Sequence, residues 1–143
     1  MTFFISTRDR LAQASDMAAV LDAAYRAFEG MRLGFRACED PAAVLFGAFV
    51  MAAAAAADGR DAVAFAPSLP SRRRHGAAGN GEGRPGGERA ERVSADAVGL
   101  SQLLVSCLER AARSVSDPGD RGACEQAARC AREICDLLGG AAQ

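Results

Sequence analysis

The feature that most constrains the fold is an uncharged run of 17 residues, 41–57, nine of which are Ala. The dipeptide Asp40-Pro41 leads into this run, and it is typical of a helix start because Asp caps free N–H groups and Pro lacks one. The pattern predicts a helix from there to about Asp58, ending at Gly59. The run falls just short of a membrane span, and Ala partitions weakly into lipid. We therefore expect a buried central helix and no membrane partner.

Three other segments carry apolar residues at three- and four-residue spacing, which is the period of an amphipathic helix. Each begins at a residue suited to capping, and two of them end at glycines. The expected bounds are Ser6 to Gly30 or Gly34, Ser94 to about Val115, and Asp117 to Gly139-Gly140. Because each helix has one broad apolar face, the helices must pack against one another.

Residues 67–92 differ from the rest, because they are rich in Gly and Arg and carry almost no apolar side chains. We therefore interpret 1–66 as one helical hairpin, 67–92 as a disordered linker and 93–143 as a second hairpin, all in a single domain. The expected fold class is all-α, a four-helix up-down bundle, since one hairpin alone cannot bury its apolar face. The expected core residues are Leu11, Leu21, Tyr25, Phe28, Leu45, Phe46, Phe49, Leu103, Leu104, Leu108, Ile134 and Leu138.

The chain has five cysteines, and its first residues lack the apolar stretch of a secretory signal. We therefore expect reduced thiols and an intracellular, cytoplasmic protein. Some of these thiols could bind a soft metal if the helices brought their sulfurs together, although buried cysteine more often serves as a small apolar residue. The candidate ligands are Cys107, Cys124, Cys130 and Cys135. Cys38, close to Arg36, is the candidate oxidation sensor. We expect no cofactor.

Two features could contact nucleic acid. The consecutive arginines Arg72, Arg73 and Arg74 could bind phosphates, although acidic residues follow in the same linker. Residues 98–110 resemble the turn and recognition helix of phage-repressor-type DNA-binding domains. The matching residues are Gly99, Leu100, Ser101, Gln102, Val105, Ser106, Leu108, Glu109 and Arg110. Such a helix reads base edges with polar groups, whereas this segment has Leu103, Leu104 and Cys107. Nucleic acid is therefore the less favoured partner.

Groups suited to catalysis are scarce. The single histidine, His75, lies in the linker, where a general base could not be held against a substrate. The chain has no phosphate-binding loop, metalloprotease motif or di-iron motif, so we expect no enzyme activity. The favoured function is a small intracellular helical interaction or accessory protein, acting with a protein partner or as a homodimer, because the Ala-rich run leaves apolar surface to bury. The alternatives are a cysteine-based metal-binding or redox-sensing protein and a nucleic-acid-binding protein.

Overall fold

The computed structural model describes residues 2–69 and 87–141, and within these ranges the chain is helical without strands, which confirms the all-α prediction. The helices are α1 (Thr2–Gln13), α2 (Met17–Ala37), α3 (Phe46–Ala64), α4 (Gly87–Ser114) and α5 (Pro118–Ala141). None of these described helices is both long enough and apolar enough to cross a bilayer.

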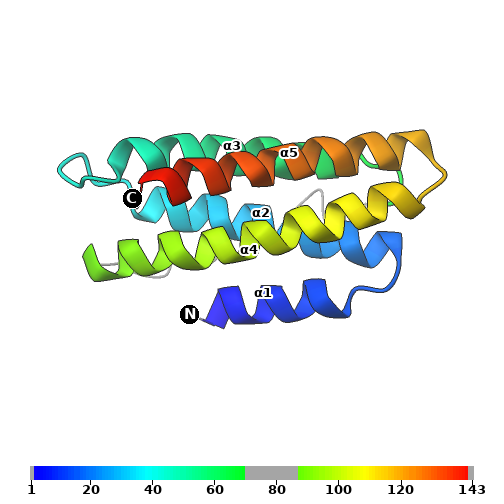
Figure 1. Cartoon of the computed structure of the whole chain (residues 1–143), viewed down its shortest axis with the longest axis horizontal. Coiled ribbons are helices and arrows are strands. Elements are labelled where there is room, and N and C mark those ends of the chain that lie inside the picture. The colour runs from blue at the N-terminus through cyan, green and yellow to red at the C-terminus, as the bar shows by residue number, and fades with distance from the viewer. Residues whose placement is uncertain (1, 70–86, 142–143) are drawn as a thin grey trace.

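The helices lie side by side along a common long axis (Figure 1). α5 packs extensively on both α3 and α4, and α2 packs on α3, whereas α1 makes smaller contacts with α2 and α4. The apolar faces meet in a single core, where the largest fully buried side chains include Phe28, Phe35, Phe49, Leu104 and Ile134. This packing leaves α1 at the edge of the molecule.

The directions of the helices differ from the alternating order that we expected. Figure 1 shows α3 and α4 running the same way, while α2 and α5 run opposite to them. Helices joined by short loops become antiparallel neighbours, as α2 and α3 do, and α4 and α5 do. The chain between Ala64 and Gly87 is far longer than such a loop, so its length does not require α3 and α4 to be antiparallel. The helix direction therefore alternates from α2 to α3 and from α4 to α5, but not from α3 to α4.

The first expected helix is two helices, so that prediction is wrong in its bounds. Asp16 begins α2, because its side chain accepts a hydrogen bond from the backbone N–H of Ala19 at 2.8 Å. Ser6 lies inside α1 and caps nothing. Gly30 and Gly34 lie inside α2 and do not end it. At Gly30 the ring of Phe3 from α1 occupies the space that a Cβ atom would need, so this glycine lets α1 approach α2.

The helix in the uncharged run begins and ends later in the chain than we expected. The Asp40 side chain accepts from the N–H of Ala42 in a local turn, and α3 begins only at Phe46. The helix continues through Gly59 to Ala64, so Gly59 does not end it. Gly59 is buried, and the ring of Phe28 lies where a Cβ atom would be. Close packing, rather than helix termination, explains this glycine.

The second helical pair begins earlier than predicted. α4 starts at Gly87, so Ser94 lies buried inside it, and residues 87–92 belong to a helix and not to a linker. Residues 70–86 lie outside the described chain, so the linker prediction remains a prediction there. The prediction for α5 is confirmed at its start: Asp117 Oδ1 accepts from the N–H groups of Gly119 and Asp120. The helix passes through Gly139-Gly140 to Ala141, so these glycines do not end it.

Most of the expected core is buried. The fully buried members are Leu11, Leu21, Phe28, Phe49, Leu104, Leu108, Ile134 and Leu138. Tyr25, Leu45 and Leu103 are half-buried and pack against them. Phe46 is half-buried at the first position of α3. The three- and four-residue spacing therefore located the inward faces correctly even where the helix ends were misplaced.

A polar contact ties the segment after α3 to the start of α5. The carboxylate of Asp120, which is 2 % exposed, accepts from Ser68 N–H at 3.0 Å and from Ser68 Oγ at 2.6 Å. A buried carboxylate is costly unless its oxygens are hydrogen-bonded, and here both oxygens are. This contact holds the end of α3 beside the first turn of α5.

Candidate functional site

One face of α3 is both apolar and exposed. Its residues are Gly47, Val50, Met51 and Ala54, which recur at three- and four-residue spacing, and Val44 precedes them in the chain. The opposite side of the helix is buried and includes Phe49, Ala52, Ala56 and Val63. We call the exposed residues Val44, Gly47, Val50, Met51 and Ala54 the α3 face.

Large exposed apolar side chains concentrate at this helix. Val50 and Met51 are 41 % and 56 % exposed on the α3 face, Val44 is fully exposed, and Phe65, directly after the helix, is 83 % exposed. In the described part of the chain, only Ile5 on α1 and Leu33 on α2 are comparable. Single exposed apolar residues are ordinary, whereas several on one helix face make this the candidate docking surface of the described chain.

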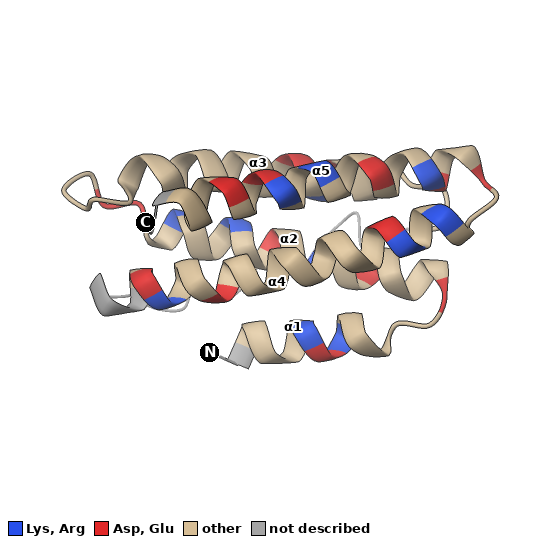
Figure 2. Ribbon diagram, in the orientation of Figure 1, with Lys and Arg blue, Asp and Glu red and all other residues tan. Residues whose placement is uncertain are grey.

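Acidic residues border the α3 face at both ends. Asp58 and Asp61 are exposed on the same side of the helix, one to two turns after Ala54, and Asp40 is exposed just before Val44. Figure 2 shows the contrast between the charged bands and the uncharged first part of α3. The face is therefore an apolar strip with carboxylates at each end.

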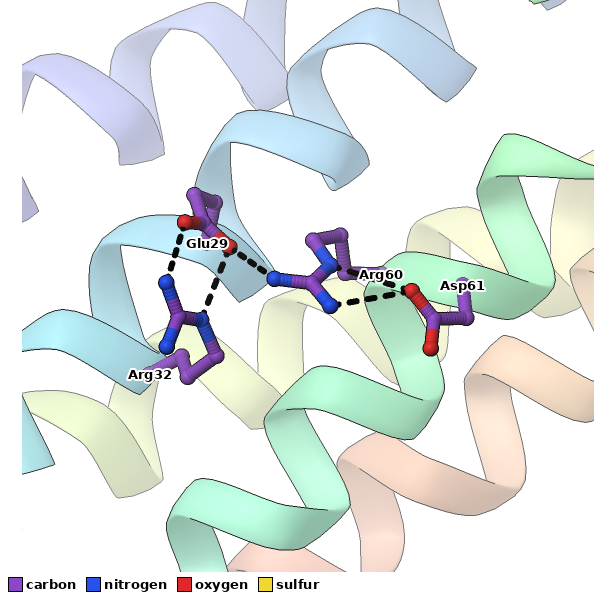
Figure 3. A network of polar contacts seen from close by, with 4 residues as sticks. All are labelled: Glu29, Arg32, Arg60 and Asp61. Carbon is purple, nitrogen blue, oxygen red and sulfur yellow. Dashed lines mark hydrogen bonds and ion pairs between the residues drawn. The ribbon is translucent and has the colours of Figure 1, made fainter. Parts of the chain in front are cut away.

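Arg60, which lies between Asp58 and Asp61 in the chain, is already engaged in ion pairs. Arg60 Nη1 donates to Glu29 Oε2 on α2 at 2.7 Å, and Arg60 Nη2 donates to Asp61 Oδ1 at 3.0 Å (Figure 3). Arg32 donates to both oxygens of Glu29, at 3.0 Å and 2.6 Å. The hydrogen bond from Arg32 is the main reason that the pKa of Glu29 lies below its ordinary value. This network joins α2 to α3 and leaves Asp58 outside it.

The structure gives hydrogen-bond partners to two of the cysteines and does not gather the described candidate ligands into a metal site. Cys124 Sγ donates to Met17 Sδ at 3.9 Å, and Cys135 Sγ donates to the carbonyl of Val98 at 3.7 Å. Cys38 is buried at the end of α2. Within the described residues, no three His, Cys, Asp or Glu side chains converge to hold a metal ion.

The described thiols are all less acidic than an ordinary cysteine. Burial raises the pKa of Cys38, Cys107, Cys130 and Cys135. Burial, with smaller contributions from the charges of Asp120 and Glu125, raises the pKa of Cys124 to about 11. A reactive cysteine needs the opposite shift, because the thiolate is the nucleophile and the species that peroxides attack.

The structure describes only one of the two segments that we considered for nucleic-acid binding. Arg72, Arg73 and Arg74, together with His75, lie outside the described residues. Residues 98–110 lie entirely within α4, which is continuous from Gly87 to Ser114. The turn that a helix-turn-helix motif needs is therefore absent at Gly99, and the expected resemblance does not extend to the backbone. Ser101, one of its matching residues, is buried and donates to Met31 Sδ at 3.6 Å.

Sequence reasoning identified the segment that carries the α3 face but not the face itself. The absence of charge over 41–57 predicted burial on most sides, whereas one side of α3 faces solvent. A helix that is apolar all round has no amphipathic pattern to show which side lacks a neighbour. The sequence signal for an exposed side was the pair of charged residues that flank the run, Asp40 and Asp58, because charged side chains place both ends of the α3 face in water.

Comparison of the chain with models of known protein families, with curated proteins and with solved structures finds no match.

Proposed function

We propose that this chain is a small helical interaction protein without catalytic activity, and that it binds a helix of a partner protein on the α3 face. The observation that carries the proposal is the exposure of Val50 and Met51 in the middle of an uncharged helix face. Methionine supports this use, because its flexible thioether side chain adapts to differently shaped partners. A straight helix face of this kind is matched by a second apolar helix.

The charges at the ends of the α3 face favour a partner with basic residues at its own ends. Asp40 at one end and Asp58 at the other would pair with Arg or Lys. In a second copy of this chain placed antiparallel, the carboxylates of the two copies would approach one another. In a parallel copy, Asp58 would face Asp58. Like charges brought together at an interface oppose association, so we favour a different protein over a homodimer.

The scaffold supports the same proposal. We propose that α2, α3, α4 and α5 form a four-helix bundle, and that the protein is cytoplasmic with reduced thiols. The single core shared by these helices and the free state of the five cysteines support this view. A bundle of this kind presents α3 as a rigid surface, so little conformational entropy is lost when a helix binds.

The test uses two synthetic amphipathic helical peptides of about 20 residues, long enough to span α3. Both carry the same Leu and Ala face, but one has Arg at its ends and the other has Glu. Fluorescence anisotropy measures their binding to the full chain. We expect the Arg-ended peptide to bind more tightly, and we expect Asp58→Asn to reduce that preference.

The double variant Val50→Thr/Met51→Gln makes the α3 face polar without adding charge, and Ile5→Thr is its matched control on the exposed side of α1. We expect the double variant to bind the Arg-ended peptide about tenfold or more weakly, since each lost apolar contact is worth about 1 kcal/mol or more. The Ile5→Thr variant should bind like the wild type. Equal binding by all three proteins would refute the proposal. Analytical ultracentrifugation that detects a dimer dispersed by the double variant would assign the face to a second copy instead.

A further inference from the structure

We propose that Met51 is the most oxidation-sensitive sulfur among the described residues, and that its conversion to the sulfoxide by a peroxide weakens docking on the α3 face. The second half of this inference rests on the proposed function, whereas the first half does not. The observations that carry it are the exposure of Met51 and the protected positions of the other described sulfur atoms.

The methionines of the described chain differ sharply in access. Met51 is 56 % exposed on the outward side of α3. Met31 is fully buried, and its sulfur accepts a hydrogen bond from Ser101 Oγ. Met17 is half-buried, and its sulfur accepts from Cys124 Sγ. An oxidant in solution therefore reaches the Met51 sulfur before those of Met17 and Met31, because oxidation follows exposure.

The cysteines do not compete effectively for the oxidant. Cys38, Cys107, Cys124 and Cys130 are buried, and Cys135 is half-buried with its thiol donating to a backbone carbonyl. Their raised pKa values keep them as thiols, and the thiol reacts with peroxides far more slowly than the thiolate. A thioether has no proton to lose, so its reaction does not depend on ionisation.

The chemical step is a two-electron oxygen transfer from the peroxide. The lone pair of the Met51 sulfur attacks one peroxide oxygen, an S–O bond forms and the O–O bond breaks. When the oxidant is hydrogen peroxide, the transferred oxygen loses its hydroxyl proton, and the departing hydroxide takes up that proton and leaves as water. Sulfur is oxidised and the peroxide is reduced. The product is polar, and burying it against an apolar partner helix without a hydrogen bond is unfavourable.

The first experiment measures the order in which sulfur atoms react. The full-length protein is treated with increasing hydrogen peroxide, quenched and digested, and mass spectrometry locates each added oxygen atom. We expect the Met51 peptide to gain oxygen several-fold faster than the Met17 and Met31 peptides, at a rate that is similar in mildly acidic and mildly basic solution. Earlier oxidation of Met17, Met31 or any of the five cysteines would overturn the proposal.

The second experiment measures the consequence with the Arg-ended amphipathic peptide described above. Each protein is compared with itself before and after peroxide, so the starting affinity of a variant does not matter. We expect the wild type to bind about tenfold more weakly after oxidation, and we expect methionine sulfoxide reductase to restore binding. Binding by Met51→Leu should not respond to peroxide. If Met51→Leu loses binding after peroxide treatment as the wild type does, the proposed role of Met51 oxidation in docking is wrong.

The two proposals fail in different ways. If the untreated protein binds neither peptide, the proposed function is wrong, and so is the proposed effect of Met51 oxidation on docking. The mass spectra still decide whether Met51 is oxidised before the other described sulfur atoms. If the untreated protein binds the Arg-ended peptide but another of the described sulfur atoms reacts before Met51, only the oxidation proposal is wrong.

Discussion

The ring of Phe28 on α2 lies against the backbone of α3 at Gly59, so closely that a Cβ atom at Gly59 would be 2.5 Å from Phe28 Cε1. Phe28 is fully buried, and because protein interiors are close-packed its ring cannot move aside without shifting its neighbours. We expect Gly59→Ala to destabilise the protein, because a packing cost of about 1–3 kcal/mol exceeds the gain of up to about 1 kcal/mol in helix propensity. Urea unfolding monitored by circular dichroism measures the change.

Gly34→Ala is the matched control for that substitution. Gly34 lies inside α2, and a Cβ atom there would meet nothing within 4 Å. We expect this variant to be more stable than the wild type by roughly 0.5–1 kcal/mol, because Ala loses less conformational entropy than Gly on helix formation. Equal stability changes in the two variants would show that Phe28 does not constrain position 59.

A second prediction concerns the buried carboxylate of Asp120. Asp120→Ala leaves Ser68 N–H and Ser68 Oγ without their acceptor, and we expect a loss of about 1–3 kcal/mol in the free energy of unfolding. Asp120→Asn keeps a side-chain oxygen for Ser68 N–H, and its amide can donate to Ser68 Oγ. It should therefore lose clearly less than the Ala variant. Thermal and urea unfolding of both proteins decides between these outcomes, and equal losses would show that the hydrogen bonds are unimportant.

A third prediction follows from the lowered pKa of Glu29. A carboxyl group whose pKa is lower in the folded chain than in the unfolded chain stabilises the fold above its ordinary value of 4.5. That contribution disappears as the pH falls through the lowered pKa. We therefore expect Glu29→Gln to be less stable than the wild type at neutral pH, by about 1 kcal/mol or less because the network is partly exposed.

The pH dependence makes this prediction specific. The stability difference between wild type and Glu29→Gln should shrink as the pH is lowered below 4.5, since the wild-type carboxyl group then becomes neutral as well. Glu133→Gln on the exposed side of α5 serves as the control. A difference that stays constant over the acidic range would mean that the side-chain shape of Glu29, and not its charge, matters to α2 and α3.

A fourth prediction concerns thiol labelling. Because Cys124 is fully buried and its pKa is raised to about 11, we expect it to react with iodoacetamide only when the protein unfolds. Cys135 is the one cysteine that is only half-buried, so it should be labelled first among the five. Peptide mapping after timed labelling in native buffer and in urea provides the measurement. Rapid labelling of Cys38 in the native protein would instead support the sensor role that its neighbour Arg36 suggested.

A helix-capping residue in the sequence predicted a helix start correctly where the hydrogen bonds of the cap join residues that are close in the chain. Asp117-Pro118 predicted the start of α5 because Asp117 accepts from N–H groups two and three residues ahead. The same dipeptide at Asp40-Pro41 made a turn to Ala42 instead, and α3 began five residues after Pro41. The same dipeptide therefore began a helix at one place and made only a turn at the other, so it does not by itself fix where a helix begins.

The sequence by itself determined that the described chain is helical, which sides of most helices are buried and that the uncharged run 41–57 contains most of an apolar helix, because these properties follow from spacing and composition over a few turns. The tertiary structure decided which side of α3 remains exposed, since α2 and α5 cover the other sides. It also decided that Gly30 and Gly59 are contact positions and not helix ends. Such outcomes depend on residues distant in the chain, such as Phe3 and Phe28, that no local pattern can place.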